Sequence, residues 1–599
     1  MNTCTLYQKP ISKTGKVSKA YPLIAIAFAC MVNICAFGQT HKASAKTFCN
    51  PINLPYNFQG DGVTRREAAD PSIVLYKNRY WLFASKQKGY WFSADLVNWK
   101  FVKPEGLPLD VYAPSVSVVN DKLCFFSGNN NGAYTTDDPV IGKWTNINRY
   151  APGCTDPYLF QDGDGKAYLY NGCSDNAPLQ VTQMDTKTFL PVANPIKLMG
   201  SNTAMHGWEV PGDENQDNGN GSISAKPWIE GAYMNKIKGK YYLQYSAPGT
   251  QYKTYGDGVY VSDKPTGPFV YASYSPFSFK PTGFITGAGH SSTFMDMQGE
   301  YWHIATATIS VRHMFERRLV LFPTFVTRDG QLVTNTYLGD YPQFASGRLN
   351  HSLLKKSPQW MLLSYNKKAI ASSVLNSAGK QNFDSGNAFD ENIRTWWSAR
   401  SGNQGEWLQV DMGKMCTVNA IQINFADQDA KASAFSVGDG YKYYLEASPD
   451  GKTWSIIINH KNKGKDAPHD YIELYKPVKA RYIRITNVHC PAKGLFSISG
   501  LRVFGIAPGK LPPHVKQFIA IRNTADRRCA YLTWDASPGA DFYIIRYGIA
   551  PDKLYSNYQV YKSTVLNINS LNTDTDYYFT IDAVNASGIT FSKVVLKNL

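Results

Sequence analysis

The chain has 599 residues, of which 43% are hydrophobic and 18% are charged. At roughly 150 residues per domain this length predicts about four domains, and the composition excludes a disordered chain and a polytopic membrane protein. The net charge is +16, but the basic residues are scattered without an arginine-rich tract, so no nucleic-acid partner is expected. Aromatic residues make up 14% of the chain, which favours an all-β fold.

The first 45 residues predict an export signal. A lysine-bearing start is followed by an apolar stretch over 21–37, and small residues suited to cleavage occur at 36–38 and 43–45. The apolar stretch is short for a membrane span and is interrupted by Asn33. We therefore expect an exported protein, in the periplasm, on the cell surface or secreted, without a transmembrane anchor.

Seven of the ten cysteines follow the predicted export signal. They lack the CxxC and Cys/His spacings of zinc sites. Pairings such as Cys154 with Cys173, or Cys416 with Cys490, suit an exported protein, and so do free thiols that fill small apolar spaces. The sequence leaves both interpretations open.

One pattern recurs five times: a polar or small residue, an apolar strand, a turn, and an aromatic-rich strand. The copies begin at Asp70, Ala113, Asp156, Glu230 and His290. Each copy predicts a β-hairpin, and the spacing leaves room for a further strand pair. Four strands repeated radially form the blade of a β-propeller, so five copies predict five blades.

Equivalent residues of different blades meet in a propeller, because the first strand of each blade lines the central axis. Asp70, Asp156, Glu230 and His290 occupy such positions. Convergent unpaired carboxylates are costly, so their recurrence indicates a functional site rather than three unrelated turns. The sequence therefore predicts that three carboxylates and a histidine meet at the axis.

Five short motifs accompany these residues in a fixed order. They are Ala69-Asp70-Pro71-Ser72, Tyr112-Ala113-Pro114-Ser115, Thr155-Asp156-Pro157, Ile229-Glu230-Gly231 and Gly289-His290-Ser291. With these motifs the segment from about 50 to 350 resembles glycoside hydrolase family 43, a family of five-bladed propellers that hydrolyse arabinans and xylans. Two departures, Ala232 where Pro is commoner and Ser291 where Gly is commoner, leave the functional side chains in place.

The resemblance implies an acid–base mechanism. Asp70 would be the general base, Glu230 the general acid, and Asp156 would orient Glu230 and keep its pKa high through like-charge repulsion. A water between base and acid gives an inverted product, with the two carboxyl groups about 6.5–9.5 Å apart. Glu209, in an insertion before blade IV, is the runner-up acid, although no other blade has its equivalent.

Four further residues are predicted to bind substrate. Tyr112 and Trp228 are candidates for stacking on the sugar, although each also suits blade packing. His290 is interpreted either as a hydrogen-bonded core residue or, as the resemblance implies, as a residue that contacts a central calcium or positions substrate. Arg318 is expected to reach the acid cluster, with a surface ion pair to Glu316 as the alternative.

Two modules follow the propeller. The stretches 387–397 and 443–454, with a closing strand at 501–505, make residues 366–506 similar to the F5/8 type C (discoidin) module. Trp534 as core tryptophan and Tyr577 as tyrosine corner make residues 513–599 similar to a fibronectin type III domain. The predicted fold class is all-β: a five-bladed propeller over 46–350, a discoidin-like β-sandwich and a fibronectin type III-like β-sandwich.

The discoidin-like module contains two local patterns that bear on function. Its structural calcium usually lies in the loop that is Asp390 to Thr395 here, but the second carboxylate it normally takes is replaced by Ser499-Gly500. Residues 448–454 resemble the Asp-box of sialidases. We interpret them as a hairpin of the module, since the box occurs once and outside the propeller.

The expected function is hydrolysis of terminal α-L-arabinofuranosyl units of plant-type polysaccharides. We expect that no cofactor is required. Whether a structural calcium binds at the propeller axis or in the discoidin-like module is left open by the sequence. A β-xylosidase or β-galactofuranosidase of the same family and a non-catalytic glycan-binding protein are the alternatives. Intact Asp70, Asp156 and Glu230 argue against a mere binder, and residues from 366 onward are expected to add binding rather than chemistry.

Overall fold

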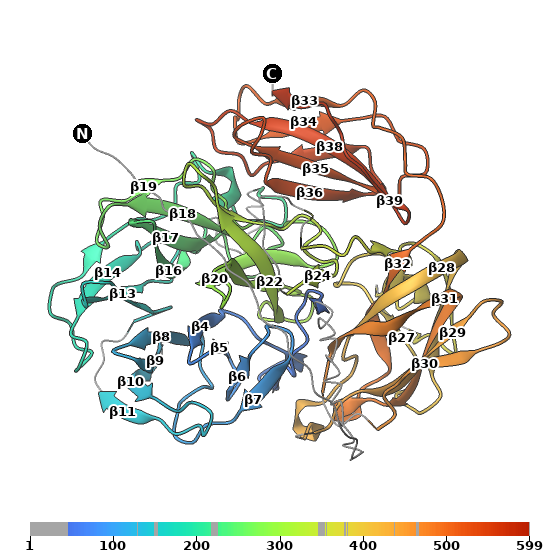
Figure 1. Ribbon diagram of the computed structural model, residues 1–599, viewed down its shortest axis with the longest axis horizontal. Coiled ribbons are helices and arrows are strands. Elements are labelled where there is room, and N and C mark those ends of the chain that lie inside the picture. The colour runs from blue at the N-terminus through green and yellow to red at the C-terminus, as the bar shows by residue number, and fades with distance from the viewer. Residues whose placement is uncertain are drawn as a thin grey trace, which may run out of the picture. The chain divides into compact units, whose positions relative to one another are not determined.

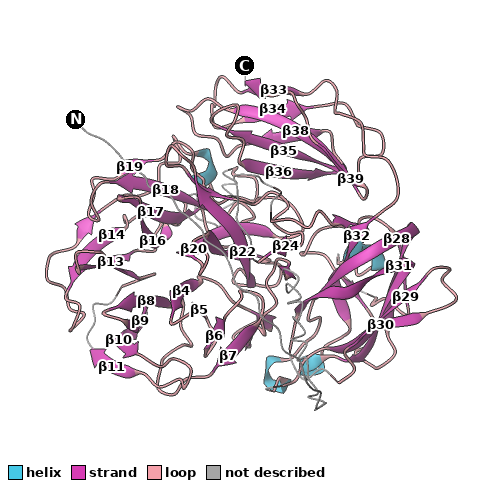
Figure 2. Cartoon of the chain, in the orientation of Figure 1, coloured by secondary structure: helices cyan, strands magenta, loops and turns pink. Residues whose placement is uncertain are grey.

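The computed structural model describes residues 46–597, apart from 129, 149–153, 217–225, 346–353, 355, 377–378, 380, 437 and 463–465. The predicted export signal therefore lies outside the described residues. Within them the fold is all-β, as predicted, and the helical segments are four short 3₁₀ turns, Gly207–Glu209, Ser385–Phe389, Ala432–Ala434 and Pro491–Lys493 (Figure 2). Across this described part, no helix combines the length and apolar character that a membrane crossing needs.

Five four-stranded antiparallel sheets, here called blades I to V, follow one another along the chain. Each is a meander in which neighbouring strands are consecutive in sequence, as expected for hairpin repeats. Their strands are β4 (Ser72–Tyr76), β5 (Arg79–Phe83), β6 (Tyr90–Ser93) and β7 (Trp99–Val102) in blade I; β8 (Ser115–Val119), β9 (Lys122–Ser127), β10 (Asn130–Thr136) and β11 (Thr145–Asn148) in blade II; β12 (Tyr158–Gln161), β13 (Ala167–Asn171), β14 (Gln180–Met184) and β15 (Ile196–Lys197) in blade III; β16 (Glu230–Ile237), β17 (Lys240–Ala247), β18 (Gly256–Ser262) and β19 (Val270–Tyr271) in blade IV; and β20 (Thr286–Met295), β21 (Tyr301–Thr308), β22 (Arg317–Val326) and β23 (Leu332–Thr334) in blade V.

The first strands of the blades form a closed ring. Strand β4 lies beside β8, β8 beside β12, β12 beside β16, β16 beside β20, and β20 beside β4. Figure 1 shows the five blades around this common centre, an arrangement consistent with the predicted five-bladed propeller. Aromatic side chains pack between blades, for example Phe83 of blade I against Phe125 of blade II with ring centroids 5.9 Å apart.

Two short strand pairs lie outside the five blades of the propeller segment. Strand β1 (Thr47–Phe48) pairs with β24 (Gln343–Phe344), so the start and the end of this segment lie together. Strand β2 (Phe58–Gln59) pairs with β3 (Arg65–Arg66) shortly before blade I. Strand β3 thus enters the fold next to the residues of the axis.

The discoidin-like module, residues 366–506, contributes to one eight-stranded sheet around a single apolar core. The hairpin of β29 and β30 encloses residues 449–454, which confirms the interpretation of the Asp-box-like stretch as a turn. The strands are β25 (Met361–Leu362), β26 (Lys368–Ala371), β27 (Trp397–Ser398), β28 (Trp407–Phe425), β29 (Lys442–Ser448), β30 (Ser455–Asn459), β31 (His469–His489) and β32 (Ser497–Ile506).

The C-terminal strands form a three-stranded and a five-stranded sheet that share one core. Trp534 and Tyr577 are both buried in this core, and the Tyr577 hydroxyl accepts the Asn572 N–H at 3.2 Å. The fibronectin type III resemblance itself stays a prediction. The strands are β33 (Ile519–Arg522), β34 (Ala530–Thr533), β37 (Val565–Ile568), and β35 (Phe542–Gly548), β36 (Ser556–Tyr561), β38 (Tyr578–Asn585), β39 (Gly588–Thr590) and β40 (Leu596–Lys597).

All seven cysteines of the described residues carry free thiols. The pairings of Cys154 with Cys173 and of Cys416 with Cys490 are therefore not formed in this structure. Four of the seven are buried, as small apolar fillers would be. Cys173 is partly exposed and has a different environment, described below.

Candidate active site

The blades bend sharply where they reach the axis. Asp70, Ala113, Asp156, Gly231 and His290 have φ of 53°, 45°, 48°, 63° and 41°, in the left-handed region that non-glycine residues rarely adopt. Such strained backbone concentrates at functional sites, where it aims a side chain. In blade IV the bend falls on Gly231, one residue after Glu230, so Glu230 does not share the backbone position of the other axis residues.

Asp70 is held as an ionised carboxylate. Its Oδ2 accepts the Ser85 hydroxyl at 2.5 Å, and its Oδ1 lies 3.3 Å from Arg317 Nη1 and 3.2 Å from His290 Nδ1. Burial alone would raise the Asp70 pKa, but the charges of Arg317 and His290 and the Ser85 hydrogen bond outweigh it and lower the pKa. A carboxylate that stays ionised suits a general base.

His290 lies between two carboxylates. Its Nδ1 is 3.2 Å from Asp70 Oδ1 and 3.8 Å from Asp156 Oδ2. Burial opposes the charged imidazolium, but the carboxylates of Asp70, Asp156 and Glu230 outweigh it and raise the pKa of His290. The raised pKa favours the protonated ring and thus a positive charge inside the cluster.

Both oxygens of Glu230 accept hydrogen bonds. The Tyr255 hydroxyl donates to Oε1 at 2.5 Å, and the Cys173 thiol donates to Oε2 at 3.1 Å. Burial raises the pKa of both donors well above their ordinary values, and the nearby Glu230 charge adds to it, so both groups stay protonated. Sequence reasoning missed both residues, and it treated Cys173 only as a filler or a disulfide partner.

Asp156 is the carboxyl group with the raised pKa. Burial raises its pKa to about 7, with the charges of Glu230 and Asp70 adding to the effect and His290 and Cys173 opposing it. At neutral pH the Asp156 carboxyl therefore holds a proton for part of the time. The like-charge repulsion expected between Asp156 and Glu230 acts on Asp156 in this structure.

A repeated contact links neighbouring blades at the axis. In blades I, III, IV and V a polar side chain near the end of the second strand bonds the axis residue of the next blade, whereas the Ser127 hydroxyl of blade II has no hydrogen-bond partner among the described residues. The contacts are Ser85 Oγ to the Ala113 N–H (2.8 Å), Cys173 Sγ to the Glu230 carboxylate (3.1 Å), Ser246 Oγ to the His290 N–H (2.7 Å) and Thr306 Oγ1 to the Asp70 N–H (2.8 Å).

The structure corrects the prediction for Arg318. Arg317, not Arg318, reaches the acid cluster, where it contacts Asp70 and, at 3.0 Å, Glu67. Adjacent side chains of a strand point to opposite sides, and on β22 the side facing the axis falls on Arg317. Arg318 points away and donates to His469 Nε2 at 2.7 Å, so neither substrate contact nor the surface ion pair with Glu316 describes it.

The two aromatic candidates lie in different surroundings. The Tyr112 ring lies 5.4 Å from the Phe315 ring and 5.9 Å from the Arg317 guanidinium, next to the cluster, and burial raises its pKa to about 12. Trp228 is 41% exposed, and its backbone N–H donates to the Pro248 carbonyl. An exposed indole two residues before Glu230 suits a sugar contact, and stacking by either ring stays a prediction.

Glu209, the runner-up acid, is buried and its carboxylate holds the local fold together. It is fully buried and accepts hydrogen bonds from the Tyr245 hydroxyl at 2.6 Å and the Asn202 N–H at 2.5 Å, and His206 Nδ1 lies 2.9 Å away. These contacts attach the insertion before blade IV to that blade. Glu209 is therefore wrong as an alternative to Glu230.

The axis cluster has one feature of a cation site. Ligand atoms of Asp156, Glu230 and His290 lie within 4.8 Å of one another, a spacing that admits a metal ion. Calcium takes six to eight oxygen ligands, however, and both oxygens of Glu230 already accept hydrogen bonds from Tyr255 and Cys173. These residues alone do not make a calcium site, and a metal at His290 stays a prediction.

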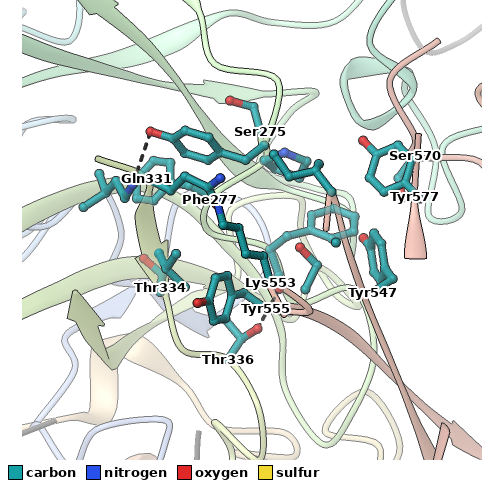
Figure 3. A pocket seen from close by; sticks show the side chains of 18 residues that line it. Ser275, Phe277, Gln331, Thr334, Thr336, Tyr547, Lys553, Tyr555, Ser570 and Tyr577 are labelled. Atoms are coloured by element: carbon teal, nitrogen blue, oxygen red, sulfur yellow. Dashed lines mark hydrogen bonds between the residues drawn. The ribbon is translucent and has the colours of Figure 1, made fainter. Parts of the chain in front are cut away.

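A hollow lies away from the axis, between blades IV and V and the C-terminal sheets (Figure 3). Tyr547, Tyr555 and Tyr577 line it together with Lys553. Its volume is about 30 Å³, far below the roughly 300 Å³ or more of typical ligand pockets. It is too small for a sugar ring.

The fold and the axis cluster together define a class of protein: a propeller whose central site combines an ionised carboxylate, a histidine with a raised pKa and a carboxyl group that holds a proton for part of the time at neutral pH. Such a set is suited to acid–base chemistry. Within the chain, residues 61–332 match the model of glycosyl hydrolases family 43, and residues 368–498 match that of the F5/8 type C domain. Both resemblances are confirmed for these residues.

Three relatives show the range of similar proteins. An arabinoxylan arabinofuranohydrolase of Paenibacillus polymyxa is 29% identical over 31% of this chain and 30% of its own length. An arabinoxylan arabinofuranohydrolase of Bacillus subtilis (strain 168) is 26% identical over 46% of this chain and 58% of its own length. A β-D-galactofuranosidase, xynD, of Aspergillus niger is 26% identical over 39% of this chain and 72% of its own length. The chain thus matches less than a third of the length of the first of these relatives.

Proposed function

We propose that the protein is a glycoside hydrolase with an inverting acid–base mechanism. Asp70 is the base, Glu230 the acid, and Asp156, which holds a proton for part of the time at neutral pH, orients Glu230. The observation that carries the proposal is the opposite tuning of two neighbouring carboxyl groups, since the pKa of Asp70 is lowered and that of Asp156 is raised to about 7. The lowered pKa keeps Asp70 ionised as the base, and the raised pKa keeps a proton on Asp156 within 4.8 Å of the proposed acid Glu230.

In the proposed hydrolysis two protons move while one bond forms and another breaks. Asp70 removes a proton from a water molecule as its oxygen bonds to the anomeric carbon. The bond from that carbon to the leaving oxygen breaks, and Glu230 gives that oxygen a proton. Arg317 and His290 keep Asp70 ionised until water is bound, while Tyr255 and Cys173 fix the direction of the Glu230 carboxyl group.

The proposed substrate is a terminal α-L-arabinofuranosyl unit of a plant-type polysaccharide. Two of the relatives are named arabinoxylan arabinofuranohydrolases, which supports this choice. The relative named β-D-galactofuranosidase supports a β-galactofuranosyl unit as the second candidate. A β-xylosyl unit is the third. We also propose that the protein is exported and needs no cofactor for the reaction.

Substitution of the acid tests the proposal. Glu230→Gln is expected to reduce turnover of natural glycans by several orders of magnitude, but turnover of aryl glycosides with good leaving groups by much less, because such groups need little protonation. The control is Glu105→Gln, an exposed glutamate that is expected to change neither rate. Equal losses on both kinds of substrate would contradict the role of Glu230, and an inactive wild-type protein on all aryl furanosides and xylosides tried would contradict the proposed function.

A further inference from the structure

Strands β3 and β22 lie next to each other, and on each of them the side chains of consecutive residues point to opposite sides of the strand. The Arg318 side chain on β22 donates to the Arg66 carbonyl on β3 at 2.8 Å, and the Ala68 N–H donates to the Arg317 carbonyl at 3.3 Å. On both strands one arginine faces the axis and the next faces the discoidin-like module. This follows from the two-residue period of an extended strand.

The side facing the axis forms a buried chain of charges. Glu67 lies 2.9 Å from Arg65 and 3.0 Å from Arg317, and Arg317 lies 3.3 Å from Asp70. All four side chains are buried. Glu67 therefore fixes the guanidinium that keeps the proposed base ionised.

The opposite side of the same strands is paired with the discoidin-like module. Arg66, which is fully buried, lies 3.0 Å from Asp427 and forms two hydrogen bonds with Asp466, one of them at 3.1 Å. Its guanidinium also lies 4.0 Å from the centre of the Phe58 ring. The charge of Arg66 is thus compensated by carboxylates that the module supplies.

Arg318 has its partner in the same module. Its Nε–H donates to His469 Nε2 at 2.7 Å. Burial, with the charges of Arg318 and Arg66, lowers the pKa of His469 well below its ordinary value, so the ring is neutral and this nitrogen accepts. The other ring nitrogen, Nδ1, then donates to Asn424 Oδ1 at 2.9 Å. The hydrogen bonds thus fix both the tautomer and the orientation of His469.

We infer that the discoidin-like module holds the proposed catalytic base in place: Asp427, Asp466 and His469 are positioning residues that act on Asp70 through β3 and β22. The inference rests on the proposed function, and it differs from the expectation that this module only adds glycan binding. A buried arginine that loses one carboxylate must move or find water. Any shift of Arg66 passes to Glu67, the next residue, and from there to Arg317.

The test uses the full chain with the substitution Asp466→Asn. The matched control is Asp411→Asn in the same module, since Asp411 forms a two-point pair with Arg481 at 2.7 and 2.8 Å on a partly exposed face. On small aryl glycosides, which have no need of a binding module, Asp466→Asn is expected to lower kcat roughly tenfold to a hundredfold with little change in KM. Asp411→Asn is expected to leave both unchanged.

The leaving group distinguishes this effect from a disturbance of the acid. A misplaced base slows attack by water whatever leaves, so the loss should be similar for good and poor leaving groups, unlike that of Glu230→Gln. An unchanged kcat in folded Asp466→Asn, or an equal loss in Asp411→Asn, would overturn the inference while leaving the proposed function intact.

A second pair of variants covers the case in which Asp466→Asn does not fold. His469→Gln keeps a hydrogen-bond acceptor for Arg318 and is expected to retain kcat. His469→Leu leaves the buried Nε–H of Arg318 without an acceptor, so its kcat should fall. Equal kcat in the two would count against the inference. Calorimetry gives a readout that needs no activity: the propeller and the module should unfold in one transition, and two separate transitions would overturn it.

Discussion

Gly231 is the position where a single added carbon would disturb the proposed site most directly. A Cβ there would lie 2.9 Å from His290 Cγ, 3.0 Å from His290 Cδ2 and 3.1 Å from Ser246 Oγ. Carbon atoms pack at about 3.5–4.0 Å, so Gly231→Ala must push the His290 ring by about half an ångström or more. The ring can yield only by changing its distances to Asp70 and Asp156.

The expected magnitude has two parts. The residue at 231 has φ of 63°, and a side chain in this region costs about 1–2 kcal/mol. Overpacking a buried site costs a further 1–3 kcal/mol or so. We therefore expect Gly231→Ala to lower the free energy of unfolding by about 2–5 kcal/mol, and to lower kcat by roughly a hundredfold because His290 and Asp70 are displaced.

Gly239 provides the matched control. It lies in the turn between β16 and β17 of the same blade, with φ of 83°, and a Cβ there would meet no atom within 4 Å. Gly239→Ala should lose only the backbone part, about 1–2 kcal/mol, and keep wild-type kcat. Denaturant unfolding and turnover of an aryl glycoside measure both quantities. If the two alanine variants behave alike, the contact with His290 has no effect and the reasoning is refuted.

Further predictions concern proton transfer. The kcat/KM should fall as pH rises through about 7, because the Asp156 carboxyl then loses the proton that the proposed mechanism keeps beside the acid; a rate that stays flat to about pH 9 would contradict this. Arg317→Lys should raise the pKa of Asp70 and move the acidic limb of the same profile to higher pH, and an unmoved limb would count against the ion pair. Cys173→Ser, which keeps a donor to Glu230, should retain more kcat than Cys173→Ala; the reverse order would show that the hydrogen bond has no role. Proton NMR of the first-formed sugar should show the inverted anomer, whereas a retained anomer or an adduct on Asp70 would refute the assignment of the base.

Much of the fold and of the axis could be predicted because the repeat carries them. Each blade begins with a polar or small residue before an apolar strand, and the propeller geometry brings these positions together. Asp70, Asp156 and His290 could therefore be grouped although they are far apart in the chain. Glu230 was grouped with them, but its backbone bend falls one residue later, and only φ values reveal that difference.

The choice between Arg317 and Arg318 could not be made from sequence. Strand β22 is buried on both faces, so polar and apolar residues do not alternate along it and its register is not visible in the pattern. The pairing of Arg66 with Asp427 and Asp466 joins residues about 400 positions apart, and no repeat or motif connects them.

Cys173 and Ser85 did have a signal that sequence reasoning overlooked. A small polar residue stands at or near the end of the aromatic-rich strand in blades I, III, IV and V, and the structure shows these residues bonding the axis. Cys173 has the same position in its blade as the serine and threonine residues have in theirs. This position alone indicates that the Cys173 thiol donates a hydrogen bond to the axis.

The contacts that pass from blades I, III, IV and V to the axis residue of the next blade have a consequence for evolution and for engineering. Asp70, Glu230 and His290 are each specified by two consecutive blades, because one blade carries the residue and the preceding blade supplies the hydroxyl or thiol that holds it. Moving blade I, IV or V therefore separates two such pairs, and moving blade II or III separates one. Blade exchange between propellers should preserve function only when the unit moved is cut through the middle of blades, so that each second strand travels with the first strand that follows it.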